Sequence, residues 1–286
     1  MRNLAFDIPG KHHVALTVLL LCFGCGQQTA TKTNARSNPP ATDPAQATDP
    51  THIDKDSANS NSAGTNPNTT SKDTSQVAVA REKCVAPASI KAAPRSIADI
   101  TALLNALPKP VTIPCLLDVL PRPFLVNASS SQLSIQPAVD EHSPRIFVFF
   151  DDLIVTFVPA GDGSKVVEFS EVIDNTTSVK GEIAFPVTAA LAPTVAFDRV
   201  KGSSGASTRC AACHAGETKA PASFPDGAFV SKAVKPFKSS DVPLDNLAAD
   251  AAACKDEADQ RCAILHALFE GDVKPQAFPV EMKTLF

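Results

Sequence analysis

Residues 145–158 read RIFVFFDDLIVTFV, and this stretch sets the expected fold of the central part of the chain. Two runs rich in Val, Ile and Phe, residues 145–150 and 153–158, flank the pair Asp151-Asp152. β-Branched and aromatic residues favour strands, and polar residues between two such runs favour a turn. The stretch therefore predicts two neighbouring strands joined by a short turn.

Similar short runs lie on both sides of this stretch, and a further turn is expected at PAGDGS. The additional predicted strands are QLSIQ (132–136), KVVEFSEV (165–172) and GEIAFPV (181–187). Together these runs predict a β-meander or small sandwich with one covered face.

A helix is expected before the strands, in RSIADITALLNALPK. Ser96 is placed to cap its N-terminus with Asp99 at the third helical position, and Pro108 stops it. Its apolar residues recur at helical spacing: Ile97, Ile100, Leu103, Leu104 and Leu107. We therefore expect residues 83–200 to form a domain with a helix and a β-rich part.

The N-terminus has the pattern of an export signal. After a basic start, residues 14–25 read VALTVLLLCFGC, an apolar run too short for a membrane span and typical of a signal peptide. CFGCG resembles the lipidation site of bacterial lipoproteins, which would make residues 1–25 the signal and Cys25 the lipid-anchored residue. The alternative is an ordinary signal that is cleaved near Ala30.

Residues 26–82 are nearly all small or polar, as in NPPATDPAQATDPTH. Such a segment cannot bury enough apolar surface to offset its conformational entropy. We expect a disordered linker that holds a folded domain away from a membrane. This predicts an exported protein of the cell envelope that faces the periplasm.

The stretch RCAACHA, residues 209–215, carries the most specific chemistry in the chain. Its C-x-x-C-H pattern is typical of c-type haem attachment. Cys210 and Cys213 would form thioethers with the haem, and His214 would ligate the iron. Export agrees with this prediction, because bacteria attach haem c outside the cytoplasm.

Other chemistries of a C-x-x-C pair are weighed against haem. A redox dithiol usually lies in a βαβ pattern, which is not seen around Cys210. A zinc site would need a second close pair, for which Cys254 and Cys262 are widely spaced candidates. A disulfide between Cys210 and Cys213 would leave His214 unexplained.

The remaining cysteines are expected to form disulfides in an exported protein. Cys84 and Cys115 bracket the predicted helix, and Cys254 and Cys262 lie close in sequence. One continuous helix would separate the latter pair by about 12 Å, and a disulfide tolerates roughly 7 Å between Cα atoms. Their pairing therefore requires a helix break near Asp256, and two buried thiols are the alternative.

Residues 201–286 resemble a monohaem c-type cytochrome through Cys210-Ala211-Ala212-Cys213-His214. Two helical stretches, PLDNLAADAAAC and DEADQRCAILHALFEG, follow the motif. The resemblance implies a mainly helical module with one covalent haem c. The expected fold class is thus α+β, a β-rich domain followed by a cytochrome c-like haem domain.

Three possibilities exist for the sixth iron ligand. Met282 lies in the irregular segment FPVEMKT, like the segments that supply a methionine ligand in c-type cytochromes. His266 is the alternative, at the edge of the apolar stripe of its helix. An open iron would instead permit gas binding or peroxide chemistry.

These features predict an electron-transfer protein rather than an enzyme, because no catalytic acid, base or nucleophile stands out. A haem enzyme or gas sensor with an open sixth site, and an envelope binding lipoprotein without haem, remain alternatives. The net charge of −4 gives no reason to expect nucleic-acid binding. The expected partner is an unidentified redox protein, and basic residues near the motif would steer it if it is acidic. These residues are Arg199, Lys201, Arg209, Lys219, Lys232, Lys235 and Lys238.

Overall fold

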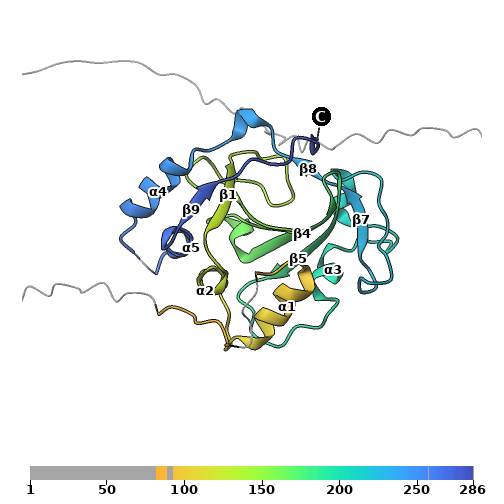
Figure 1. The fold of residues 1–286 in the computed structure, drawn as a ribbon, viewed down its shortest axis with the longest axis horizontal. Helices are drawn as coiled ribbons and strands as arrows, with labels where there is room; N and C mark the ends of the chain where they lie inside the picture. The colour runs from red at the N-terminus through yellow and green to blue at the C-terminus, as the bar shows by residue number, and fades with distance from the viewer. Residues whose placement is uncertain (1–81, 89–92, 257, 286) are drawn as a thin grey trace, which may run out of the picture. The chain divides into compact units, whose positions relative to one another are not determined.

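The structure is a computed structural model, and it describes residues 82–88, 93–256 and 258–285. The predicted signal peptide (1–25) and Cys25 lie outside the described residues, as does all but the last residue of the predicted linker. The described residues form a mixed α+β fold with an eight-stranded sheet and five α-helices (Figure 1). The expected α+β class is therefore confirmed at this level.

The sheet has the strand order β6-β7-β5-β4-β3-β2-β1-β9. Neighbouring strands are antiparallel except β1 and β9, which are parallel. The strands are β1 (Phe124–Ser129), β2 (Arg145–Phe150), β3 (Leu153–Phe157), β4 (Val166–Asp174), β5 (Thr177–Ala184), β6 (Thr218–Lys219), β7 (Phe229–Lys232) and β9 (Val273–Pro275). A separate two-stranded sheet joins β8 (Val234–Lys235) to β10 (Lys283–Thr284) in parallel.

The hairpin expected from RIFVFFDDLIVTFV is confirmed as β2 and β3. Phe150 pairs with Leu153 across the turn at Asp151-Asp152. The two later predicted strands correspond to β4 and β5, although β5 begins four residues earlier than expected. Antiparallel pairing continues without interruption from β1 to β5, as a meander requires.

The predicted strand QLSIQ is wrong, since residues 132–136 form a loop between β1 and β2. Serine side chains there accept hydrogen bonds from nearby backbone: Ser131 Oγ from Leu133 N and Ser134 Oγ from Gln136 N. Such local bonds compete with strand pairing. Strand β1, which sequence reasoning missed, occupies the neighbouring sheet position.

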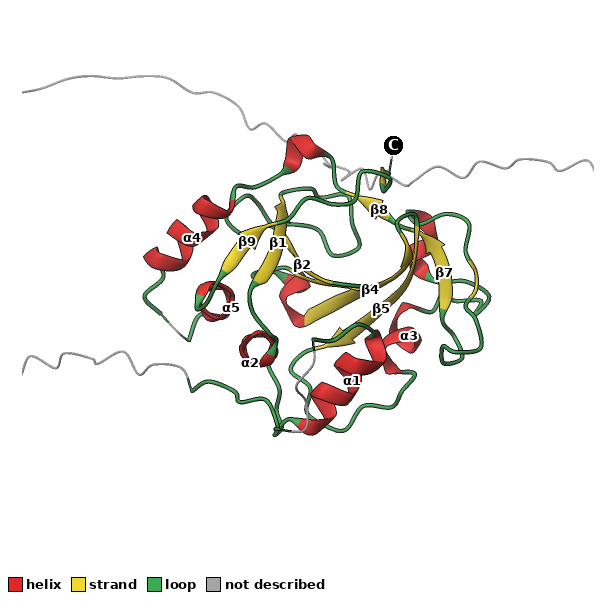
Figure 2. Ribbon diagram, in the orientation of Figure 1, coloured by secondary structure: helices red, strands yellow, loops and turns green. Residues whose placement is uncertain are grey.

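The five α-helices are α1 (Ile97–Ala106), α2 (Ile113–Val119), α3 (Val195–Val200), α4 (Leu244–Ala253) and α5 (Gln260–Phe269). Helix α1 begins as predicted, because the side chains of Ser96 and Asp99 form a reciprocal capping box. Helices α1, α2 and α3 lie on one side of the sheet, and β8 and the C-terminus lie on the other (Figure 2).

The two faces of the sheet differ in polarity because side chains alternate along each strand. One face contributes apolar residues such as Val148, Val155 and Phe169 to the main core. The opposite face carries a mixed row in which Phe147 pairs with Thr156 and Thr156 pairs with Glu168. We call this second face the pocket face.

The structure does not divide near residue 200, where the sequence analysis placed a domain boundary. Strands β6, β7 and β9 from residues 201–286 extend the sheet formed by residues 83–200. Helix α5 packs against α2, and Leu268 and Leu117 belong to the same buried core. Residues 201–286 therefore share the core of the preceding part instead of forming a mainly helical module of their own.

Both predicted cysteine pairs are at disulfide distance. The Cα atoms are 5.1 Å apart for Cys84 and Cys115 and 5.4 Å apart for Cys254 and Cys262. The expected helix break is also present, because α4 ends at Ala253 and α5 begins at Gln260. Asp259, rather than Asp256, caps α5 by accepting a hydrogen bond from Cys262 N at 2.9 Å.

Within the described ranges, no helix combines the length and apolar character needed to cross a bilayer.

Candidate cofactor site

The C-x-x-C-H residues lie on one tight turn. Arg209–Ala212 form a 3₁₀ turn, and Thr208 Oγ1 accepts a hydrogen bond from Cys210 N at 3.0 Å. The carbonyl of Cys210 accepts from both Cys213 N (3.1 Å) and His214 N (2.8 Å). Local hydrogen bonds therefore hold the two cysteines and the histidine close together.

Two carboxylates fix this turn to the rest of the protein. Glu217 accepts from Thr208 N at 2.7 Å and also from the hydroxyl of Thr208. Glu182 on β5, whose side chain is only 6% exposed, forms ion pairs with Arg209 (2.7 Å) and Arg199 (2.9 Å). Ion pairs with a buried member resist screening by salt, so the turn is well fixed before any ligand binds.

His214 has the tautomer that a metal ligand requires. Its Nδ1 lies 2.8 Å from the carbonyl oxygen of Lys232, which only accepts, so Nδ1 carries the proton. The lone pair is then on Nε2, as is usual for metal-bound histidines with a backbone partner. Burial, and to a smaller extent the charges of Lys180 and Arg145, lower the pKa of His214 to about 3, and the hydrogen bond to Lys232 opposes this shift. The imidazole is therefore neutral around pH 7.

The two cysteines of the motif are free thiols. Cys210 is buried and Cys213 is half-buried. Burial, more than any other cause, raises the pKa of the Cys210 thiol, and the hydrogen bond to Thr208 opposes it. Neither sulfur is used by the disulfides described above, so both are available for chemistry.

Cys210, Cys213 and His214 line a pocket that also contains Met282. The pocket has an empty volume of about 1130 Å³, which includes space open to solvent. The enclosed part of the pocket measures about 100 Å³, below the roughly 300–1,000 Å³ of typical ligand pockets, so a large organic group would lie mostly in its open part. Phe147, Ile154, Phe237 and Phe278 supply apolar walls.

Met282 lines this pocket and is buried, with 2% of its surface exposed. It packs in a small cluster with Phe147 and Ile154 on the pocket face of the sheet. Phe278 stands edge-on to Phe147, with ring centroids 5.0 Å apart. The irregular tail thus places its methionine beside the sheet and in the pocket of the C-x-x-C-H turn.

One short segment, residues 232–235, supports both candidate iron ligands. The carbonyl of Lys232 accepts from His214, and Val234 pairs with Lys283, the residue after Met282. The contact point of His214 and that of the Met282 segment are therefore only two residues apart in the chain, at Lys232 and Val234. Sequence reasoning had no signal for this connection, since β8 and β10 have two residues each.

His266, the alternative iron ligand, does not line this pocket. Its Nε2 donates to the carbonyl oxygen of Ala251 at 2.9 Å and so joins α5 to α4. The structure brings Met282, and not His266, to the pocket of His214.

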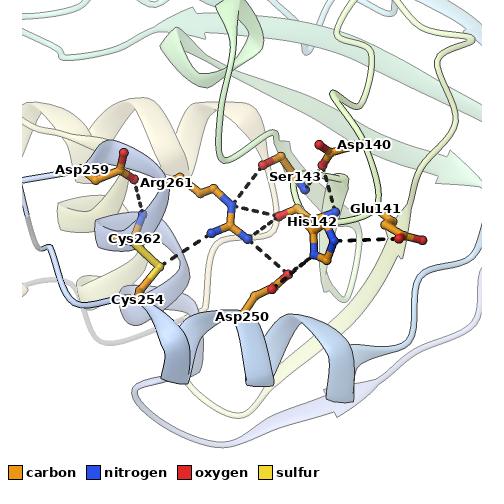
Figure 3. Close-up of polar contacts among 9 residues, drawn as sticks. All are labelled: Asp140, Glu141, His142, Ser143, Asp250, Cys254, Asp259, Arg261 and Cys262. Atoms are coloured by element: carbon orange, nitrogen blue, oxygen red, sulfur yellow. Dashed lines mark hydrogen bonds and ion pairs between the residues drawn. A yellow bond between two sulfur atoms is a disulfide. The ribbon is translucent and has the colours of Figure 1, made fainter. Parts of the chain in front are cut away.

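A second polar cluster surrounds His142 (Figure 3). His142 Nδ1 lies 3.0 Å from Asp250 Oδ2, and Arg261 contacts the same carboxylate at 3.2 Å. Arg261 also donates to the carbonyl of His142 (2.8 Å) and to Cys254 Sγ (3.7 Å). These contacts join the 130–144 loop to α4 and to the Cys254–Cys262 disulfide. We interpret the cluster as structural.

The predicted basic rim is partly neutralised. Four of its seven members form ion pairs: Arg199 and Arg209 with Glu182, Lys201 with Asp198, and Lys219 with Asp226. Lys235 donates to the carbonyl of Pro279. The rim therefore offers less free positive charge than its residue count indicates.

Sequence reasoning missed the ionisable residues on the pocket face. Arg145, Glu168 and Lys180 all line the pocket. In the sequence they alternate with apolar residues, and such residues are usually solvent-exposed in a sheet with one covered face. No local pattern distinguishes an exposed polar face from one that a later segment covers.

Comparison of the chain with protein-family models, curated proteins and solved structures gives no match. In the described part of the chain, no group of three or more His, Cys, Asp and Glu side chains is arranged to hold a metal ion. Interpretation of the pocket therefore depends on the residues that line it.

Proposed function

We propose that this protein carries one haem c, attached through Cys210 and Cys213, and transfers electrons in the bacterial cell envelope. The observation that carries the proposal is the shared pocket: both free cysteines, His214 and Met282 line it. These residues come from two segments that are far apart in sequence.

The residues fit a covalently attached haem. Thioether formation needs reduced cysteines, and Cys210 and Cys213 are the free cysteines of the described chain. Iron ligation needs an unprotonated imidazole nitrogen, and the Nδ1 contact of His214 leaves Nε2 in that state. Apolar walls favour a largely apolar ring. When bound, the haem iron would supply reversible one-electron chemistry, and its ligands and surroundings would set the potential.

Met282 supports electron transfer over catalysis at the iron. A thioether ligand occupies the sixth position and raises the potential. Met282 lines the same pocket as His214, which makes its sulfur the candidate for this position. We propose a lipid anchor at Cys25, a location facing the periplasm, and an unidentified redox protein as the partner.

A second candidate is a haem enzyme or gas sensor, and the polar pocket face favours it. Arg145, Lys180 and nearby hydroxyl groups would donate hydrogen bonds to a small ligand at an open iron. Carbon monoxide binding distinguishes the two candidates. Ready binding by the ferrous protein would favour the open site, whereas a low-spin ferric spectrum together with a ferrous form that does not bind carbon monoxide would favour Met282.

Expression of the full chain together with a haem-attachment system tests the proposal. We expect the wild-type band to stain for haem after denaturing electrophoresis, because thioether bonds survive denaturation. Cys210→Ser/Cys213→Ser should lose the stain. Cys254→Ser/Cys262→Ser is the matched control, since it also removes two sulfurs but leaves the turn intact.

An unstained wild-type band would contradict the cytochrome assignment. It would leave the third possibility, an envelope binding lipoprotein without haem.

A further inference from the structure

The pocket contains an ionic cluster that the C-x-x-C-H motif does not explain. Arg145 on β2, Glu168 on β4 and Lys180 on β5 lie on the pocket face of one sheet, in which β3 separates β2 from β4. Thr156 and Ser170 lie beside them, because Thr156 pairs with Glu168 and Ser170 with Lys180. A row of charged and hydroxyl groups on a covered sheet face requires polar partners.

Arg145 and Glu168 satisfy each other only in part. Arg145 Nη2 forms an ion pair with Glu168 Oε2. Arg145 Nε and Glu168 Oε1 are buried and have no hydrogen-bond partner among the described residues. The guanidinium also lies over the ring of Phe147, with its carbon 5.0 Å from the ring centroid. Arg145 therefore retains an unused donor inside the pocket.

Lys180 adds a second positive charge beside the Arg145–Glu168 ion pair. Its Nζ donates to Ser170 Oγ at 2.5 Å, and no ion pair of Lys180 is found within the described ranges. Burial, and to a smaller extent the charge of Arg145, lower the pKa of Lys180 to about 8, and the charge of Glu168 opposes this shift. Two cations and one carboxylate leave the cluster with a net positive charge around pH 7. An excess of buried positive charge is costly, so an anionic ligand would stabilise this arrangement.

The shape and chemistry of the cluster indicate which anion. Arg145 reaches Glu168 on β4 from one side and Lys180 reaches Ser170 on β4 from the other. Two donors that meet over β4, with hydroxyl groups between them, match a flat anion with two oxygens better than a single-atom anion. The apolar walls at Phe147 and Ile154 adjoin the cluster, so the ligand combines an apolar body with a carboxylate. A porphyrin with propionate side chains has both properties.

We propose that Lys180 and Arg145 bind a carboxylate, and that this carboxylate is a propionate of the haem attached at the neighbouring turn. The inference rests on the proposed function and goes beyond it, because it assigns a binding role to the sheet. A free organic acid that enters the same pocket would offer the same chemistry.

The test uses the haem-loaded full chain and the variants Lys180→Met and Lys180→Arg. Methionine removes the charge at similar length, and arginine keeps it. We expect Lys180→Met to shift the propionate bending band in resonance Raman spectra and to lower the midpoint potential, because a positive charge near the iron disfavours its ferric form. Lys180→Arg should restore most of both properties.

Lys219→Met is the matched control, since Lys219 is an exposed lysine of the same region whose side chain is 76% exposed. It should change neither the Raman band nor the potential. Retention of the haem stain in each variant shows that the attachment survives.

Two results would overturn the inference while leaving the proposed function intact. One is a stained Lys180→Met protein with unchanged Raman band and potential. The other is a Lys180→Met protein whose propionate Raman band is unchanged, combined with a midpoint potential that responds to added acetate in the wild type but not in Lys180→Met. This result would assign the cluster to a free carboxylate. An unstained wild-type protein would instead contradict both proposals.

Discussion

Replacement of Met282 separates a packing role from an iron-ligand role. The side chain is buried in a cluster with Phe147 and Ile154 and lines the pocket of His214. Deletion of a buried methionine side chain costs about 2–5 kcal/mol of unfolding free energy. Because Met282 borders an existing pocket, the new space would join that pocket, and we expect Met282→Ala to fall near the lower limit, about 2 kcal/mol.

Met282→Leu preserves volume and removes the sulfur. Such swaps usually cost less than about 1.5 kcal/mol, so this variant should remain folded. If Met282 ligates the iron, both variants should show a high-spin ferric spectrum, bind carbon monoxide readily and have a lower potential than the wild type. Denaturant unfolding and absorption spectra of the haem-loaded protein measure these effects.

His266→Ala is the control, because His266 is bonded to Ala251 and lies outside the pocket. It should keep the wild-type spectrum. The assignment of Met282 would be refuted by a Met282→Leu protein whose ferric form stays low-spin and whose ferrous form does not bind carbon monoxide. Loss of the low-spin form in His266→Ala would indicate the alternative ligand.

The remaining predictions concern the supports of the fold. Glu182→Gln should destabilise the protein by about 1–3 kcal/mol, since it removes the charge of a buried acceptor for two arginines, and an unchanged urea midpoint would contradict this role. Cys254→Ala/Cys262→Ala should be less stable than the oxidised wild type by roughly 2–3 kcal/mol, the loop-closure entropy of a loop of this length. The difference should disappear when the variant is compared with the reduced wild type. His142 has a raised pKa, chiefly because its ring is hydrogen-bonded to Asp250; its stabilising effect should be complete below the unfolded pKa and disappear as pH rises through the folded pKa. An NMR titration in which Asp250→Asn leaves the pKa of His142 unchanged would contradict that cause.

Local sequence patterns predicted the elements that depend on neighbouring residues. The capping box of α1 needs only Ser96 and Asp99, and the β2–β3 turn needs only the two aspartates between apolar runs. The prediction of the Cys254–Cys262 pair also worked, because it followed from the distance along a helix. In each case the relevant interactions lie within a few residues of one another.

Elements that depend on distant partners could not be predicted in this way. Strand β9 is three residues long and pairs with β1, which lies far earlier in the chain. The segment QLSIQ had the alternation of a strand. Ser134 within it and Ser131 before it accept hydrogen bonds from nearby backbone N–H groups, and no described strand pairs with the segment. A short alternating pattern indicates a possible strand, and the availability of a partner decides whether it forms.

The same reasoning explains why the motif could be recognised from sequence while its pocket could not. Cys210, Cys213 and His214 lie on one turn, so their spacing is visible in five residues. Their surroundings come from β2, β4, β5 and the C-terminal tail, which meet only in the folded chain.

The charged residues of the pocket face are solvated or buried depending on what covers that face. If residues 201–286 formed a separate module, Arg145, Glu168 and Lys180 would lie on an open sheet face and be solvated, as their alternation indicates. Because these later residues cover that face instead, the charges become part of a pocket. Covered charges are destabilising unless a ligand or partner satisfies them. A ligand that binds only the folded state stabilises it by mass action, so under the proposed function haem binding would raise the stability of this fold.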